Sequence, residues 1–388
     1  MRAQVLFGIK NRKYAEIDAP TAGDDRALVR VSRCGICGSD VPRIYKTGAH
    51  NMPLIPGHEM SGTVESCEAR PELVGKRVGI FPLIPCKECE ECRQQHYEMC
   101  KNYDYLGSRS DGGFAEYVSV PVWNLLPVPD RVCDDDAAML EPMCVAVHAL
   151  RLMGLIGDYA SLGKDTAPQA DNLDKTITVC GLGTIGLLVA LFLKDAGYRN
   201  VFCIGNKDVQ RQKLLAMGYS EEQLIDVRRE DPVGKIQEKT GGRGTDYYFE
   251  CIGRSESYEQ AVKCAAVLGQ VMLVGNPASD MGLSREVYWK ILRNQLTLRG
   301  TWNSSFYGLE AHIGAAGSDA ANTNSAGDDW GYALERLLAW SSMKADGQSV
   351  MLPSDLITHR FSLADMPKGL DIMHRKSEEY VKVMVELA

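Results

Sequence analysis

The sequence predicts an α/β protein of two domains, and three observations lead to this expectation. Its 388 residues are more than one hydrophobic core usually organises. Short apolar and polar runs alternate through residues 1–33, interrupted by Pro20 and Gly23, which is typical of β-strands joined by turns. From residue 176 onwards, apolar strands alternate with helical segments, a pattern that predicts a doubly wound parallel sheet.

The composition is that of a folded globular protein and limits the classes of partner. The chain is 45% hydrophobic and 24% charged, which fits none of the disordered classes. Its net charge of -8 argues against nucleic acid or an anionic membrane, because both favour basic surfaces. Residues 1–10 lack a signal-peptide pattern, and the longest apolar run, 182–193, is too short to cross a bilayer. We therefore expect a cytoplasmic protein.

Cys37, His58 and Glu59 form the first candidate site. They occur in the stretches Cys-Gly-Ser-Asp (37–40) and Pro-Gly-His-Glu (56–59). A thiolate, an imidazole and a carboxylate together are typical of a catalytic zinc site that leaves a position open for water or substrate. Single Cys, His and Glu residues are also common in cores and on surfaces, so these three alone leave both interpretations open.

Residues 41–50, just after Cys37, are rich in cations for an acidic chain. They include Arg43, Lys46 and His50. A solvated surface turn is one interpretation. The other is an anion-binding edge for a phosphorylated substrate.

Four of the thirteen cysteines are grouped at Cys86, Cys89, Cys92 and Cys100. Because cytosolic chains rarely hold disulfides, we interpret this group as metal ligands. The spacing fits one closed, tetrahedral zinc site that stabilises a small lobe at about residues 82–104. The bacterial ferredoxin pattern of an iron–sulfur cluster does not fit, because Lys101 follows Cys100 where that pattern has proline.

Glu141 lies within an apolar stretch, 137–150, that is predicted to be helical. A buried carboxylate is costly unless it is paired with a cation or bound to a metal. A helix N-cap or a solvent-facing turn is the alternative explanation.

A dinucleotide fingerprint lies between a predicted strand and a predicted helix. The strand 176–180 runs directly into Gly181, Gly183 and Gly186, and the helix 187–194 follows. The first glycine makes the turn, the second lets the backbone approach the pyrophosphate, and the third packs helix on strand. Further candidate cofactor contacts are Thr184 and Ile185 in this turn and Val274 on a later predicted strand, 270–275.

The end of the second predicted strand, 200–204, bears on the choice between NAD and NADP. NAD sites usually place an acidic residue there to bind the ribose 2′-hydroxyl. Here residues 205–208 are Gly-Asn-Lys-Asp, without an acid at the strand tip. Asn206, Lys207 and Arg211 could meet a 2′-phosphate, which favours NADP, while Asp208 leaves NAD open.

The order of these features resembles the zinc-dependent medium-chain dehydrogenases along essentially the whole chain. Residues 34–44, 103–117 and 300–305 are similar to motifs of the polyol-phosphate branch of that family, the second being Tyr-Asp-Tyr-Leu-Gly-Ser-Arg-Ser-Asp-Gly-Gly-Phe-Ala-Glu-Tyr. The resemblance implies two zinc sites per chain. The catalytic ligands would be Cys37, His58, Glu59 and Glu141, some of them exchanging for water, and the four grouped cysteines would form the structural site.

The resemblance also implies the domain order. A β-rich, GroES-like catalytic domain at 1–150 would be rejoined by residues 291–388, with a Rossmann cofactor domain at 151–290 between them. Residues 157–175 predict a linker, and 313–329 predict a surface insertion. Relatives are commonly homodimers or homotetramers.

Two features depart from the family pattern. Many relatives carry a relay histidine five positions after the ligand cysteine, where this chain has Pro42. The acid at the tip of the second strand is also missing, although NAD-dependent relatives have it.

The activity implied by the resemblance is hydride transfer between a secondary hydroxyl of a sugar-alcohol phosphate and NAD(P). Zinc would lower the pKa of the hydroxyl, and Ser39 would release its proton. An unphosphorylated polyol or another secondary alcohol is the nearest alternative substrate. A redox sensor that binds dinucleotide without turnover is a further alternative, against which stands the open ligand set. The candidates for phosphate and hydroxyl recognition are Arg43, Lys46, His50, Arg109 and Asn303.

Overall fold

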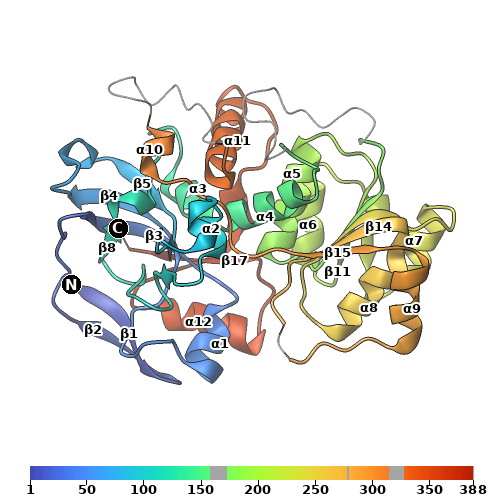
Figure 1. The fold of residues 1–388 in the computed structure, drawn as a ribbon, viewed down its shortest axis with the longest axis horizontal. Coiled ribbons are helices and arrows are strands. Elements are labelled where there is room, and N and C mark those ends of the chain that lie inside the picture. The colour runs from blue at the N-terminus through green and yellow to red at the C-terminus, as the bar shows by residue number, and fades with distance from the viewer. Residues whose placement is uncertain (158–172, 278, 314–326, 388) are drawn as a thin grey trace. The chain divides into compact units, whose positions relative to one another are not determined.

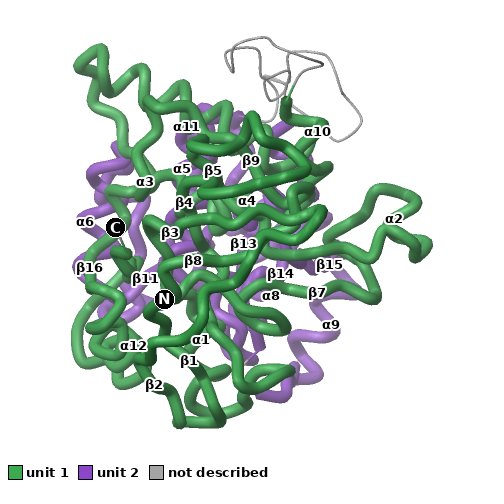
Figure 2. Tube along the Cα trace, turned by 90° about the vertical axis from the view of Figure 1, so that its left-hand side faces the viewer, with its two compact units in different colours: residues 1–144, 304–388 green, residues 145–303 purple. Residues whose placement is uncertain are grey.

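The computed structural model describes residues 1–157, 173–277, 279–313 and 327–387. The chain divides into two compact units, of which unit 1 contains residues 1–144 and 304–388 and unit 2 contains residues 145–303 (Figure 1, Figure 2). Unit 1 is therefore built from both ends of the chain. Most of the predicted linker at 157–175 and of the predicted insertion at 313–329 lies outside the described residues.

The main sheet of unit 1 has seven strands. They are β3 (Arg26–Ile36), β4 (Glu59–Ser66), β5 (Arg77–Ile80), β8 (Tyr117–Pro121), β9 (Leu125–Pro127), β16 (Ile357–Ser362) and β17 (Lys382–Glu386). The order is β16-β17-β3-β4-β5-β9, and β8 also pairs with β3. Because β17 pairs antiparallel with β3, with Val383 opposite Ile36, the last strand of the chain completes the N-terminal sheet.

Two small strand pairs and several helices complete unit 1. The strands are β1 (Arg2–Gly8) with β2 (Asn11–Glu16), and β6 (Leu83–Ile84) with β7 (Asp104–Tyr105). The α-helices are α1 (Asp40–Pro42), α2 (Glu90–Arg93), α3 (Asp134–Ala138), α10 (Leu309–His312), α11 (Asp329–Ala345) and α12 (Met366–Arg375), and a π-helix spans Arg43–Thr47. Short 3₁₀ helices span Pro71–Leu73, Tyr97–Met99, Val122–Asn124 and Pro353–Leu356. The helix α4 (Leu140–Leu152) begins in unit 1 and ends in unit 2.

Unit 2 is a doubly wound parallel sheet, which confirms the predicted fold class. Its strands are β10 (Ile177–Cys180), β11 (Val201–Gly205), β12 (Leu224–Asp226), β13 (Thr245–Glu250), β14 (Ala265–Leu273) and β15 (Thr297–Gly300). They follow the order β12-β11-β10-β13-β14-β15, and every neighbouring pair is parallel. The strand order reverses between β10 and β13, and doubly wound sheets bind ligands at such a switch point.

The helices of unit 2 form two groups. They are α5 (Thr184–Asp195), α6 (Asp208–Ala216), α7 (Pro232–Lys239), α8 (Ser255–Cys264) and α9 (Arg285–Arg293), with a 3₁₀ helix at Glu221–Gln223. One group is α5 with α6, and the other is α7, α8 and α9 (Figure 1). The unit ends at residue 303, whereas the sequence predicts 290, because α9 leads into β15 and this strand pairs with β14. It begins at residue 145 rather than 151.

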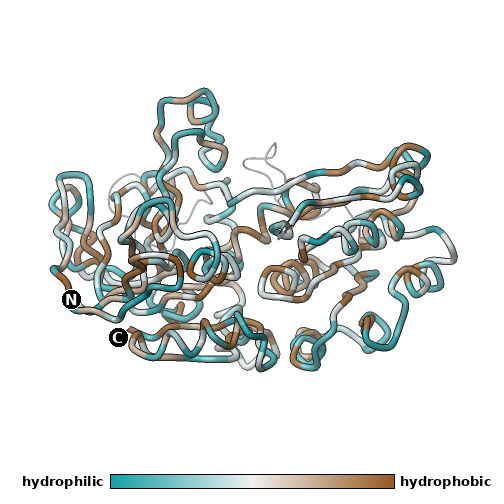
Figure 3. Tube along the Cα trace, turned by 90° about the horizontal axis from the view of Figure 1, so that it is seen from below, coloured by the Kyte–Doolittle hydropathy of each residue, from teal (hydrophilic) through white to brown (hydrophobic). Residues whose placement is uncertain are grey.

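Each unit has its own hydrophobic core. In unit 1, apolar side chains from β3, β4, β5, β8 and β17 pack together, and in unit 2 those from β10 to β14 do so. Figure 3 shows hydrophobic stretches, in brown, alternating with hydrophilic ones, in teal, along the chain. Among the described residues, no helix has both the length and the apolar character that a membrane span requires.

Candidate metal centres and cofactor site

Cys37, His58 and Glu59 come together beside the β3–β4 pair of unit 1. Their ligand atoms all lie within 4.8 Å of one another. Cys37 directly follows β3 and Glu59 opens β4, and the antiparallel register places Gly35 opposite Glu59. The pairing of these two strands therefore brings the end of β3 to the start of β4.

Glu59 forms a buried ion pair with Lys382, which sequence analysis did not single out. The two side chains are 3% and 2% exposed, and Lys382 also donates a hydrogen bond of 3.3 Å to the Ile36 carbonyl. Gly35 makes room for the pair, because a Cβ there would overlap the Glu59 carboxylate and lie 2.6 Å from the Lys382 Cε. The signal in the sequence is a lysine within the otherwise apolar strand 380–385.

Asp40 fixes the turn after Cys37. Its fully buried carboxylate accepts hydrogen bonds from the Cys37 N–H over 3.0 Å and from the Arg43 guanidinium over 2.5 Å. Its Oδ1 lies 3.7 Å from the His58 Nδ1, which is buried and has no hydrogen-bond partner in the described part of the chain. One ring nitrogen of His58 belongs to the ligand group, and a carboxylate such as Asp40 on the other side of the ring is the arrangement that orients a metal-binding histidine.

Glu141 lies near the same cluster. It is in the first turn of α4 and 8% exposed, which excludes a solvent-facing turn. Burial is the main cause that raises the pKa of Glu141 to about 8. The charge of His58 opposes this rise, and the charges of Glu59 and Cys37 add to it. Its carboxylate is not among the ligand atoms within 4.8 Å of one another, so Glu141 stands beside that group.

The electrostatics of the cluster favour a bound cation. Burial, with Glu59 and Asp40, raises the pKa of the Cys37 thiol to about 11. A metal ion would reverse this effect, because a coordinating thiol is deprotonated. A thiol, an imidazole and buried carboxylates are a donor set that fits zinc.

The cation-rich segment after Ser39 is helical. α1 continues directly into the π-helix at 43–47. Tyr45 anchors this segment, because its hydroxyl donates to Asp371 over 2.8 Å and its ring stacks on His374 at 4.1 Å. The Ser39 hydroxyl hydrogen-bonds to the Cys37 thiol. This bond lowers the pKa of the thiol and so offsets a small part of the rise that burial causes.

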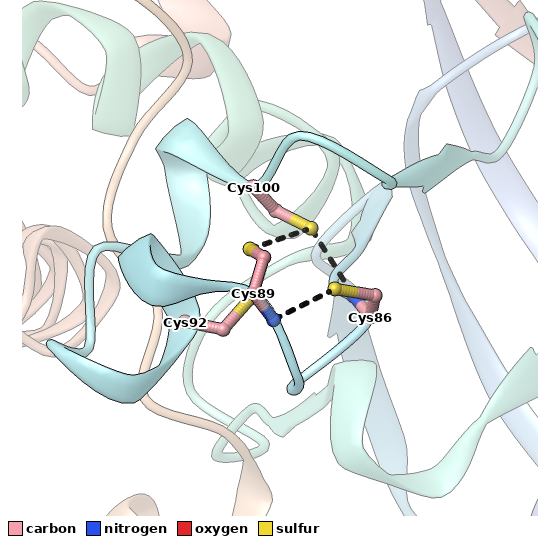
Figure 4. Close-up of side chains that lie close together, drawn as sticks. All are labelled: Cys86, Cys89, Cys92 and Cys100. Carbon is pink, nitrogen blue, oxygen red and sulfur yellow. Dashed lines mark hydrogen bonds between the residues drawn. The ribbon is translucent and has the colours of Figure 1, made fainter.

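The four grouped cysteines also come together (Figure 4). Their sulfur atoms lie within 4.8 Å of one another. The Cys86 N–H donates to the Cys100 sulfur over 3.2 Å, and the Cys89 N–H donates to the Cys86 sulfur over 3.4 Å. Backbone N–H groups of Glu88 and Cys89 lower the pKa of Cys86 to about 6. Burial raises the pKa of the Cys92 and Cys100 thiols. Four thiols gathered in this way fit a closed tetrahedral zinc site, because a bound metal ion would hold them as thiolates.

The fingerprint glycines of unit 2 form a tight turn between β10 and α5. Gly181 has a φ of +94°, and a Cβ there would press on the Cys251 backbone. A Cβ on Gly186 would overlap the Gly181 carbonyl, whereas one on Gly183 would meet nothing within 4 Å. Gly183 thus leaves open space at the N-terminus of α5, at the switch point of the sheet.

Polar and charged side chains surround the tip of β11. The Gln210 side chain accepts hydrogen bonds from the N–H groups of Asn206 and Lys207 over 3.1 and 3.2 Å. Arg211 is paired with Glu221, and both side chains are about half exposed. Arg228, which sequence analysis missed, bridges Asp208 and Asp226 at 2.5 and 2.7 Å.

Comparisons with known proteins agree with this geometry. Residues 23–130 match the model of the alcohol dehydrogenase GroES-like domain, and residues 184–314 match that of the zinc-binding dehydrogenases. Galactitol 1-phosphate 5-dehydrogenase of Escherichia coli K12 is 34% identical over 281 residues, covering 72% of this chain and 76% of that protein. The chain belongs to the zinc-binding alcohol dehydrogenase family. It is therefore an oxidoreductase that acts on CH–OH groups with zinc and a nicotinamide cofactor.

Other members of the family are also similar. L-Threonine 3-dehydrogenase of Vibrio parahaemolyticus is 26% identical over 389 residues, covering 96% of each chain. The crystal structure of galactitol-1-phosphate dehydrogenase from E. coli has a TM-score of 0.80 and 27% identity, covering 100% of both chains. A zinc-binding dehydrogenase from Sinorhizobium meliloti solved with NADP has a TM-score of 0.78 at 24% identity, covering 99% of this chain and 98% of that chain, and shows the shared fold.

The five residues proposed to bind the substrate of this dehydrogenase have different surroundings. Arg43 is occupied by Asp40, whereas Lys46 and His50 are exposed. Arg109 lies half buried over the Tyr103 ring, with its guanidinium carbon 4.6 Å from the ring centre. Asn303 belongs to unit 2, and the other four belong to unit 1.

Proposed function

We propose that this zinc-binding dehydrogenase oxidises a secondary hydroxyl of a sugar-alcohol phosphate such as galactitol 1-phosphate. The observation that supports this most is the combination of the Cys37–His58–Glu59 cluster with cationic side chains in the segments directly around it. Phosphate esters are bound by such cations through charge-assisted hydrogen bonds. The similarity to galactitol 1-phosphate 5-dehydrogenase supports the same substrate class.

The catalytic metal would be held by Cys37, His58 and Glu59, with Glu141 beside them as an exchanging ligand. Zinc supplies Lewis acidity there, which lowers the pKa of an alcohol as it lowers that of water to roughly 7. Ser39, next to Cys37, accepts the hydroxyl proton and passes it outward, a route that does not need the histidine replaced by Pro42. The four grouped cysteines would hold a second, structural zinc.

Unit 2 would bind the nicotinamide cofactor through the fingerprint turn, including Thr184 and Ile185, and through Val274 beyond β14. We propose NADP as the preferred form, because Asn206 and Lys207 stand where an acid would bind the 2′-hydroxyl. Arg228 and Arg211 lie in exposed ion pairs, and such pairs are weak enough for a 2′-phosphate to compete with them.

A substrate panel tests this proposal. Zinc-replete enzyme is assayed at equal concentrations of galactitol 1-phosphate, free galactitol and L-threonine, each with NAD and with NADP. We expect the phosphate ester with NADP to give the highest kcat/KM. A higher value for galactitol or L-threonine would replace the substrate assignment. L-Threonine is included because L-threonine 3-dehydrogenases are similar over nearly the whole chain. Cofactor binding without oxidation of any alcohol would support a redox sensor.

We also propose that the enzyme is a cytoplasmic homodimer or homotetramer. β15 is an edge strand of the unit 2 sheet, and Val267 and Leu268 on the neighbouring β14 are 66% and 67% exposed. An uncovered edge beside exposed apolar side chains is suited to pairing with a second copy. Light scattering after size-exclusion chromatography gives the oligomeric state, and a monomer at micromolar concentration would contradict this proposal.

A further inference from the structure

We infer that Arg109, stacked on Tyr103, binds the phosphate of the substrate and determines the preference for a phosphorylated alcohol. The inference rests on the proposed function and adds the residue that distinguishes the ester from the free alcohol.

The state of its side chain singles out Arg109 among the candidate cations. Its guanidinium forms no hydrogen bond or ion pair with any described residue, although its Nε is buried. Arg43 is held by the buried carboxylate of Asp40. Asp111, the nearest acid along the chain, accepts a hydrogen bond from the Ile55 N–H over 2.8 Å. Arg109 is thus a partly buried charge with a donor that lacks an acceptor, which calls for an anion.

The turn that carries Arg109 packs on the backbone beside the metal cluster. The Arg109 N–H donates to the Tyr105 carbonyl over 2.9 Å, and the Gly113 N–H donates to the Gly57 carbonyl over 2.8 Å. A Cβ on Gly107 or on Gly112 would overlap the Gly57 carbonyl, so no side chain fits between the two segments. Gly57 directly precedes His58, and the turn is therefore fixed against the metal-ligand segment.

Two aromatic rings connect the guanidinium to the cluster. The ring centres of His58 and Tyr105 are 5.8 Å apart, and those of Tyr105 and Tyr103 are 6.2 Å apart, both in edge-on geometry. Arg109 lies over the far ring of this series. The phosphate of a linear sugar-alcohol ester is several bonds from a secondary hydroxyl. The phosphate of such an ester therefore lies away from the Cys37 and His58 end of the substrate, and Arg109 is our candidate for the residue that meets it.

The chemistry of the pair suits a phosphate monoester. A guanidinium presents donors in a planar fork that matches two phosphate oxygens. The cation–π contact with Tyr103 holds the guanidinium over the ring without using its donors. The Asn51 side chain donates a hydrogen bond of 2.8 Å to the backbone carbonyl of Arg109. The backbone N–H of His50 donates one of 3.3 Å to the backbone carbonyl of Ser108. These bonds place the His50 backbone beside the same turn.

The first test compares kcat/KM for galactitol 1-phosphate and galactitol in Arg109→Gln, Tyr103→Leu and Tyr103→Phe. In Arg109→Gln we expect the value for the ester to fall about 30-fold or more, mostly through KM, because a charge-assisted bidentate contact is lost. The kcat/KM for galactitol, which has no phosphate, falls much less than that for the ester, and a Tm within a few degrees of the wild type shows that the variant is folded. Tyr103→Leu loses about two- to fivefold on the ester, and Tyr103→Phe keeps the wild-type value. Arg293→Gln is the control, because Arg293 lies over the Trp289 ring at 5.5 Å in unit 2.

The second test measures binding of inorganic phosphate to the zinc-replete enzyme by calorimetry. Wild type and Arg293→Gln bind phosphate, and Arg109→Gln does not. An unchanged ratio of the two kcat/KM values in Arg109→Gln would overturn the inference while leaving the proposed function standing. If the wild-type enzyme oxidises no phosphate ester, the proposed function fails. The binding of inorganic phosphate then decides by itself whether Arg109 forms an anion site. Loss of binding in Arg109→Gln supports the anion site, and undiminished binding overturns it.

Discussion

At the residue scale, the candidate catalytic centre depends on two charged side chains to which the sequence analysis assigned no role. Asp40 holds the Cys37 turn, and Lys382 holds Glu59. The candidate ligands Cys37, His58 and Glu59 could be singled out from the sequence because each lies in a short glycine-containing motif, and the structure brings them together. Lys382 could not, because its contact with Glu59 joins residues 323 positions apart and depends on the pairing of β17 with β3.

Replacement of Lys382 by methionine tests its role as the counter-charge of Glu59. Removing one partner of a buried ion pair typically costs about 3–5 kcal/mol, because the other charge stays buried. A metal ion would restore the balance of charge, so we expect Lys382→Met to lower the Tm of zinc-free enzyme more than that of zinc-replete enzyme. The control is Lys368→Met, which removes an exposed ion pair with Asp365 and changes either Tm little. Equal losses with and without zinc would contradict this role.

Replacement of Cys37 by alanine separates catalysis from folding. We expect Cys37→Ala to abolish NAD(P) reduction, to lose one of the two proposed zinc ions and to keep the Tm within a few degrees, because the thiol lies outside both strands. Elemental analysis, the absorbance assay and thermal melting give these three quantities. Cys133→Ala removes an exposed cysteine and is the control. Turnover retained by Cys37→Ala would remove this residue from the site.

At the element scale, local patterns were more informative than long-range ones. The strand–glycine–helix fingerprint predicted β10 and α5 because all of its parts are contiguous. The four cysteines of the predicted lobe lie together because only a short segment separates them. The cation-rich segment is helical up to Thr47. The sequence does not show this, because the segment is anchored by Asp371 and His374 of α12, and the sequence does not indicate that α12 packs on it. For the same reason, the assignment of β15 to the unit 2 sheet follows from the structure.

The ends of α10 and α11 are joined by His312, which makes the stability of unit 1 depend on pH. Its Nε2 lies 3.1 Å from an Asp328 oxygen and its Nδ1 lies 2.8 Å from the Gly308 carbonyl, so only the protonated ring can donate to both. Burial lowers the pKa of His312, but the hydrogen bond and charge of Asp328 outweigh it, and the pKa is raised. The stabilisation is therefore complete below the unfolded pKa of about 6.5 and is lost as pH rises through the folded pKa.

We expect His312→Gln to lower the Tm clearly at pH 6 and much less at pH 9. Thermal melts of both proteins at the two pH values give this difference. His359→Gln is the control, since its partner Glu378 is 61% exposed. An equal loss at both pH values would mean that His312 acts through packing on Phe306 rather than through its charge.

At the whole-molecule scale, the candidate metal ligands lie in unit 1 and the glycine fingerprint lies in unit 2. The order of these two features along the chain could be predicted, since each has its own motif. The sequence placed the unit boundaries at 150 and 290 instead of 144 and 303, because hydrophobic pattern alone does not show which sheet a strand joins.

The cofactor preference of unit 2 is tested by Asn206→Asp, which supplies an acid at the tip of β11. A carboxylate there would repel a 2′-phosphate and accept hydrogen bonds from a 2′-hydroxyl. We expect the ratio of kcat/KM for NADP to that for NAD to fall by about tenfold or more. Arg243→Gln, on the turn before β13, is the control. An unchanged ratio would show that the 2′ group is bound elsewhere.

The most direct measurement is the reduction of nicotinamide, followed by absorbance, with galactitol 1-phosphate and zinc-replete enzyme. Wild-type enzyme should reduce NADP, and NAD less well, while Cys37→Ala should reduce neither. No reduction of either cofactor by wild-type enzyme with its zinc content intact would contradict the assignment of a sugar-alcohol phosphate as the substrate.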